Sequence, residues 1–150
     1  MIARYRNVPY RYLPEIAIAD VAFEAWADSM EELFAAAADA TMNVMVGDPE
    51  TIAWLKTRMI HAEESEVDML LLQLLQELIF FKDAERLLLR VKRLDVRQRG
   101  GLYVLEAELG GEEIDPARHD LVVDVKAVTL HRFRVEQTPS GWEATVILDI

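Results

Sequence analysis

The chain has 150 residues, of which 52% are apolar and 29% charged. A chain of this length and composition can bury a self-standing core, so we expect one domain over residues 1–150 and exclude a disordered protein. The formal charge of −11 disfavours direct binding to nucleic acid and favours a basic protein surface or a divalent cation as partner, although an excess of carboxylates also serves solubility alone.

No part of the sequence indicates a membrane segment or an export signal. Arg4, Arg6 and Arg11 are not followed by the apolar stretch of a signal peptide, and no window approaches the ~18 uninterrupted apolar residues of a membrane span. The chain has no cysteine, which excludes disulfides, thiolate metal sites and cysteine nucleophiles. We therefore expect a cytoplasmic protein.

The first elements predicted are two strands. Residues 10–13 form a short aromatic strand candidate that Pro14 stops. Residues 16–27 alternate loosely between two faces, which is typical of a half-buried strand. In that strand Asp20 lies on the face opposite Val21 and Phe23.

Two helices and a weaker strand follow. Ser29 and Glu32 have the spacing of a capping box, so a helix begins there, and apolar residues three and four apart continue it until Gly47. Residues 51–61 are compatible with a strand or a poor helix, and the start signal of a second helix just after them favours the strand. A second helix opens at Ser65 and runs through a leucine-rich stretch to Phe81, which indicates the buried centre of the fold.

The second half of the chain is predicted to be mainly strands. Residues 86–96 and 102–109 are strand candidates, with turns expected at Gly100–Gly101 and again at Gly110–Gly111. Residues 114–120 form a polar loop, residues 121–137 hold one long strand or two, and residues 142–150 form the last strand. The predicted class is α+β, with a mainly antiparallel or mixed β-sheet and two α-helices packed on one face.

Two aspartates are set in short apolar runs, Asp20 near the start and Asp149 beside the final Ile150. An ionised aspartate inside such a run is costly unless a cation, a hydrogen-bond donor or an edge position satisfies it. Two carboxylates on strands together with the terminal carboxylate form an all-oxygen site suited to Ca²⁺, Mg²⁺ or Mn²⁺. The alternative is that each aspartate caps a strand end or meets water.

Other polar residues have simpler interpretations. His119 and His131 have the chemistry of ligands or general bases, yet lone histidines on strands more often fill a core or a surface. Lys126 pairs with an acid or a partner, or is solvated. The chain lacks both a Gly-x-Ser-x-Gly nucleophile elbow and a glycine-rich phosphate loop, so we expect neither a serine hydrolase nor direct nucleotide binding.

Several stretches, taken in order, resemble the archease family, and together they span nearly the whole chain. They are residues 19–25, 30–34, 36–37, 75–80, 115–119, 125–129 and 131, and the ending Asp149-Ile150. No single piece is diagnostic, and the resemblance is carried by their sum.

The resemblance implies a protein that is not itself an enzyme. Archeases assist the RtcB-type RNA ligase, which acts in tRNA splicing and RNA repair in a manganese- and GTP-dependent reaction, by promoting ligase guanylylation and multiple turnover. The resemblance therefore implies that this protein contacts RNA only indirectly, through the ligase. In the family a divalent cation such as calcium is held by residues that match Asp20, Asp149 and Ile150 here.

One departure separates the chain from the family pattern. The family usually has His-Thr shortly before the first aspartate, whereas the aligned positions here are Ala17 and Ile18, which removes a polar neighbour of the cation. Two other functions are kept open by the residues. One is a stand-alone metal-dependent hydrolase that uses the same carboxylates, and the other is a chaperone-like scaffold that is indifferent to metal.

Overall fold

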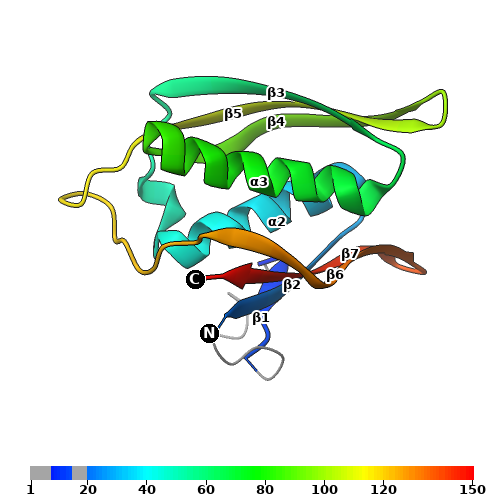
Figure 1. The fold of residues 1–150 in the computed structure, drawn as a ribbon, viewed down its shortest axis with the longest axis horizontal. Helices are drawn as coiled ribbons and strands as arrows, with labels where there is room; N and C mark the ends of the chain where they lie inside the picture. The colour runs from blue at the N-terminus through cyan, green and yellow to red at the C-terminus, as the bar shows by residue number, and fades with distance from the viewer. Residues whose placement is uncertain (1–7, 15–19) are drawn as a thin grey trace.

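The computed structural model describes residues 8–14 and 20–150, which form three layers (Figure 1). Helices α2 (Met30–Met45) and α3 (Val67–Glu85) lie between two antiparallel sheets, and each helix contacts both sheets. This confirms the expected α+β class with two α-helices. The strands divide into two sheets, each with the helices packed on one face.

The four-stranded sheet has the order β1-β2-β7-β6 and contains both ends of the described chain. Its strands are β1 (Tyr10–Tyr12), β2 (Val21–Ala27), β6 (Ala127–Thr138) and β7 (Gly141–Asp149). Phe23, Val146 and Leu148 are fully buried and join the main core beneath the helices. The three share the face of β2 and β7 opposite that of Asp20 and Asp149.

The three-stranded sheet has the order β3-β5-β4, so the middle strand comes last in the sequence. Its strands are β3 (Lys56–Glu64), β4 (Leu87–Arg99) and β5 (Leu102–Glu113). The predicted turn at Gly100–Gly101 joins β4 to β5, and both glycines have positive φ angles of 57° and 82°. The strand predicted over residues 51–61 begins later, because the 3₁₀ helix η1 (Pro49–Thr51) comes first.

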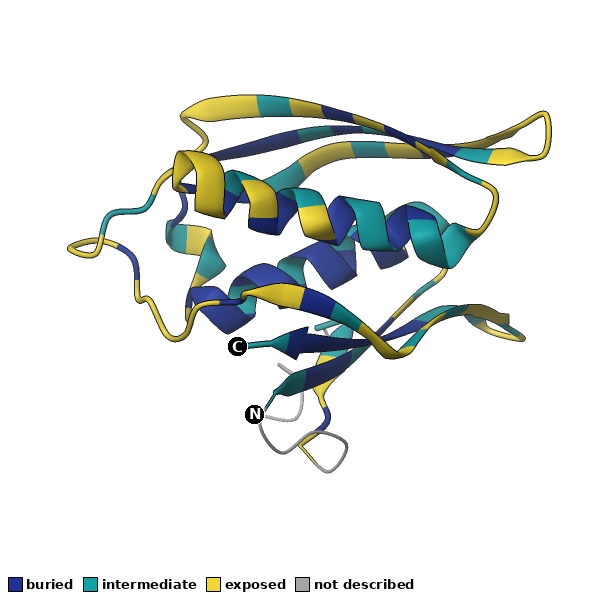
Figure 2. Cartoon of the chain, in the orientation of Figure 1, coloured by how far each residue is buried: buried dark blue, intermediate teal, exposed yellow. Residues whose placement is uncertain are grey.

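The two helices follow the sequence signals that predict them. At the start of α2 the Ser29 hydroxyl oxygen accepts a bond from the Glu32 amide at 3.2 Å and donates to the Glu32 carboxylate at 3.1 Å. Helix α3 begins one residue later than Ser65 suggests, since Glu66 is its N-cap and makes no side-chain capping bond. Its leucines are buried as expected except for Leu72, which is partly buried, and Figure 2 shows the deepest burial where the helices meet the sheets. Within the described part of the chain, neither helix has the length and hydrophobicity needed to cross a bilayer.

The turn predicted at Gly110–Gly111 is wrong, because both glycines lie inside β5. A Cβ atom on Gly111 would lie 1.8 Å from the carbonyl oxygen of Leu88 on β4, and one on Gly110 would lie 2.5 Å from the Trp54 ring. The glycines are therefore required for close packing, with the neighbouring backbone in one case and with an indole ring in the other. The sequence alone does not distinguish two glycines required for close packing from two glycines in a turn.

The loop of residues 114–126 is fixed at its start by a buried carboxylate. Glu112, at the end of β5, accepts bonds from the Ala53 amide at 2.6 Å and from the Arg118 guanidinium, and lies 3.0 Å from Nε2 of His119. Burial raises the pKa of Glu112, but these three partners outweigh it and lower that pKa to about 2. The carboxylate thus holds the segment after η1 and the loop together.

Substituting the two glycines separately tests the reason for their presence. We expect Gly111→Ala to cost about 3 kcal/mol or more in the free energy of unfolding, because backbone atoms of β4 must move. We expect Gly110→Ala to cost less, because the half-exposed Trp54 ring can rotate away. Urea denaturation of both variants measures the difference, and an equal or reversed order would contradict the packing argument.

The Glu112 carboxylate also predicts a pH dependence. Its pKa falls from 4.5 in the unfolded chain to about 2 in the native state, so its stabilisation is complete above about pH 4.5 and is lost as the pH falls toward 2. We expect Glu112→Gln to lower stability by about 1–3 kcal/mol at pH 7 and to converge with the wild type in acid. Urea unfolding from pH 7 to pH 2.5 tests this, with the exposed neighbour Glu113→Gln as control. Parallel curves for wild type and Glu112→Gln would refute it.

Candidate metal site

Asp20 and Asp149 lie at neighbouring ends of β2 and β7. Asp149 is the last residue of β7, and Asp20 immediately precedes β2. Val21 is paired with Leu148, so continuing this register by one residue sets Asp20 opposite Asp149. Both residues are half-buried. The fold therefore brings together two acids that stand at opposite ends of the sequence.

The directions of the main-chain hydrogen bonds show how close the two acids come. On the β1 side, the Ala22 carbonyl accepts a bond from the Leu13 amide, and on the β6 side the Asp149 carbonyl accepts one from the Lys126 amide. Main-chain groups alternate in direction along a strand, so Asp20 and Asp149 turn theirs away from each other. In a regular antiparallel sheet, residues arranged in this way form a non-hydrogen-bonded pair, in which the side chains are close; Asp20 itself lies in a bend just before β2.

The two carboxylates share the outer face of the four-stranded sheet, away from the helices. On that face the residues next along the strands are Ala22 and Ile147, which are buried with Leu13 in a small apolar cluster of their own. The carboxylates thus border apolar surface on one side. Both carboxylates are themselves partly exposed to solvent.

Two like charges placed opposite each other destabilise a sheet, and a cation between them reverses that effect. Among residues 8–14 and 20–150, no three or more His, Asp or Glu side chains gather in a way that could hold a metal ion. A cation held by Asp20 and Asp149 therefore needs further oxygen donors, and Ile150 directly follows Asp149. Such a donor set contains only oxygen, which fits a hard cation such as Ca²⁺, Mg²⁺ or Mn²⁺.

Other residues selected from the sequence have structural roles or lie elsewhere. The His119 side chain is fully buried, and its Nδ1 accepts the Asp115 amide at 2.9 Å while its Nε2 faces Glu112, so it stabilises the loop. His131 is exposed where the β6–β7 pairing is irregular. Lys126 is exposed next to the candidate site. Ala17 and Ile18 lie outside the described residues.

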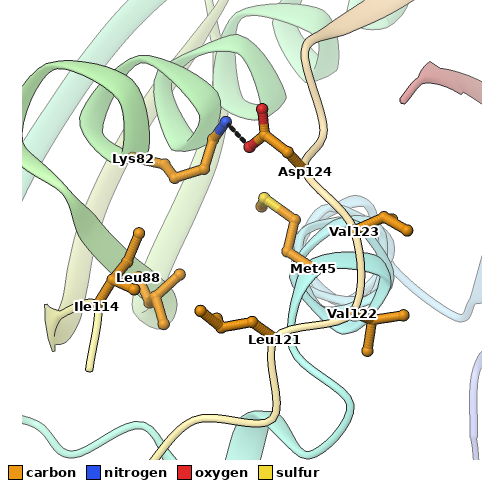
Figure 3. A pocket seen from close by; sticks show the side chains of 8 residues that line it. All are labelled: Met45, Lys82, Leu88, Ile114, Leu121, Val122, Val123 and Asp124. Carbon is orange, nitrogen blue, oxygen red and sulfur yellow. Dashed lines mark hydrogen bonds and ion pairs between the residues drawn. The ribbon is translucent and has the colours of Figure 1, made fainter. Parts of the chain in front are cut away.

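A buried lysine is the main feature that the sequence pattern did not predict. Lys82, in the last turn of α3, is only 6% exposed and forms an ion pair with Asp124 at 2.5 Å (Figure 3). It forms a second ion pair with Asp83 at 2.6 Å. Burial lowers the pKa of Lys82, but the two aspartates raise it above its ordinary value, so the ammonium stays charged. In the sequence, the only sign that Lys82 is buried is its position beside Phe81, at the end of an apolar helix.

The sequence and fold of the chain are similar to those of known proteins of one family. A model of the archease protein family matches residues 10–150. The archease of Pyrococcus furiosus is 32% identical over 133 residues, which are 88% of this chain and 93% of that protein. The archease of Methanosarcina barkeri is 32% identical over 142 residues, which are 94% and 95% of the two chains.

Two solved structures share the fold. The solution structure of protein 1598 from Methanobacterium thermoautotrophicum has a TM-score of 0.82 at 28% identity, covering 95% of this chain and 99% of that one. The crystal structure of a Thermotoga maritima archease, described as a possible chaperone, has a TM-score of 0.63 at 16% identity, covering 89% and 93%. On the evidence of the family match and of these relatives, the chain belongs to the archease family.

Proposed function

We propose that the protein is a non-enzymatic accessory factor that activates an RtcB-type RNA ligase by means of a divalent cation bound to Asp20, Asp149 and Ile150. The observation that supports this most is the pairing of Val21 with Leu148, because Asp20 and Asp149 are the next residues along these two strands. Membership of the archease family supports the choice of partner. The ligase itself binds the RNA and GTP.

The residues of the chain prepare the site for the cation and for the partner. Pairing of β2 with β7 fixes the spacing of the carboxylates, so little freedom is lost when an ion binds. The Lys126 amide orients the last residues by holding the Asp149 carbonyl at 2.8 Å. A bound cation supplies Lewis-acid stabilisation of charge on phosphate groups. The site lies at the edge of the molecule, where a partner protein can reach it.

The charge of the chain suits this role. With a net charge of −11, the protein is attracted to the basic surface that an RNA-binding enzyme presents, and such attraction increases the rate of association. A scaffold function is the second candidate, because the Thermotoga maritima relative is described as a possible chaperone. The two differ in their dependence on metal: only the accessory function requires Asp20 and Asp149.

Cation affinity tests the site directly. We expect Asp149→Asn to weaken Ca²⁺ and Mn²⁺ binding by at least about tenfold, because a carboxylate ligand is lost. Isothermal titration calorimetry measures the affinity, and the rise in melting temperature with added cation is a second readout. Glu143→Gln is a matched control, since Glu143 lies on the same strand and the same face, further from the end. Equal cation affinities for the wild type and Asp149→Asn would contradict the proposed metal site.

Ligase activation tests the function. In single-turnover guanylylation of the ligase with Mn²⁺ and a substoichiometric amount of this protein, we expect the wild type to accelerate the reaction and Asp149→Asn to have no effect. Stimulation by both proteins would show that the carboxylate is not needed and would favour the scaffold. Failure of the wild type to stimulate would reject the ligase as partner.

A further inference from the structure

Three consecutive apolar residues are exposed on the loop that leads into β6. Leu121 is 43% exposed, Val122 58% and Val123 39%. Isolated exposed apolar residues are ordinary on protein surfaces, but a contiguous group marks a surface that binds something. Figure 3 shows these side chains beside Lys82 and Asp124. We call residues 121–124 the apolar strip.

The strip is held rigidly although it is not part of a sheet. Beneath it, Lys82 donates a bond of 2.8 Å to the Val125 carbonyl and pairs with Asp124. The Val122 amide donates to the Met45 carbonyl at the end of α2 at 2.9 Å, and the Lys126 amide is bonded to β7. A surface fixed in this way loses little entropy when a partner binds. By holding the main chain at Val125 and the side chain of Asp124, the buried Lys82 ammonium keeps the apolar side chains of the strip exposed.

A cavity opens beneath the strip. It has a volume of about 230 Å³ and is lined by apolar side chains, including Met45, Leu88 and Ile114, with Lys82 at its margin (Figure 3). This volume is below the roughly 300–1,000 Å³ that is usual for small-molecule sites. A single apolar side chain from another protein fits such a cavity better than a cofactor does.

The charges around the strip are acidic. Asp120 and Asp124 flank the three apolar residues and are exposed. The Asp120 carboxylate lies over Gly47, where a Cβ atom would approach its oxygen to 2.3 Å. Lys82 pairs with Asp83 and Asp124, so these three groups together carry one negative charge; Asp120 adds a second and the exposed Lys126 offsets one, which leaves the rim negative. The complementary surface is basic.

We propose that the apolar strip and its cavity are a docking site for a protein segment that inserts one apolar side chain into the cavity and sets an arginine or lysine against Asp120 and Asp124. The identity of that partner rests on the function proposed above, which makes it the RtcB-type ligase. The strip leads into the chain that pairs with β7, because the Lys126 amide bonds the Asp149 carbonyl. Docking at the strip thus brings the partner to the carboxylates. In this proposal the strip provides affinity for the ligase, and the carboxylates with their cation activate it.

The experiment compares binding with activation for purified ligase. We expect Val122→Asp to raise the Kd for the ligase by about tenfold or more, because a charge replaces an apolar contact. Cation affinity stays unchanged, and a saturating concentration of the variant restores full stimulation. Asp149→Asn is expected to behave in the opposite way, with ligase binding retained and stimulation lost. Biolayer interferometry and the guanylylation assay give the two readouts.

Two further variants complete the test. Met59→Asp places the same charge at a residue 62% exposed on β3, in the other sheet, and leaves the Kd unchanged. Asp120→Asn keeps the shape of the rim, raises the Kd about threefold and makes it less dependent on salt. An unchanged Kd for both Val122→Asp and Asp120→Asn overturns the docking site while leaving ligase activation intact. Absence of ligase binding by the wild type overturns both proposals.

Discussion

Antiparallel pairing of β2 with β7 is the interaction on which the rest of the structure depends. These are the two central strands of their sheet, and a single register positions both of their faces. On the inner face it buries Phe23, Val146 and Leu148 against the helices. On the outer face it sets Asp20 beside Asp149. A slip of one residue would turn Leu148 to solvent and separate the acids, so the core and the candidate site are specified together.

Buried charges in this protein fix the position of a loop. Burying a charge is unfavourable unless partners compensate for it, and both Glu112 and Lys82 have several. Glu112 holds the start of the loop of residues 114–126, and Lys82 holds its end. Between them the chain remains outside any sheet and exposes apolar side chains. The buried charges of Glu112 and Lys82 thus keep apolar side chains of this loop exposed on the surface.

Local signals in the sequence predicted local structure well. The capping box at Ser29 gave the start of α2, and leucines at helical spacing gave the burial of α3. Prediction failed where an interaction between distant segments determined the outcome. Gly110 and Gly111 resemble a turn, yet they make room for Trp54 and for the backbone at Leu88. Residues 121–126 have the composition of a strand, yet α2 and Lys82 satisfy part of their main chain.

For the candidate site, too, the sequence indicates the local features but not the contact between distant segments. The sequence indicates two aspartates in apolar runs, but not that they meet, because that depends on a register between segments at opposite ends of the chain. The family resemblance connected them before the fold did. Lys82 and Glu112 were missed because the partners that make their burial tolerable come from the loop of residues 114–126 and from the segment after η1.

The position of β7 at the far end of the chain also affects how the protein is made. During synthesis β2 emerges long before its central partner β7, so closing this sheet requires contact between segments more than a hundred residues apart. Until then the apolar face of β2 and the helices beside it lack their cover. A chain interrupted before β7 would thus carry an aggregation-prone edge and no paired carboxylates. The sheet that carries the candidate site can therefore close only after β7 has been made.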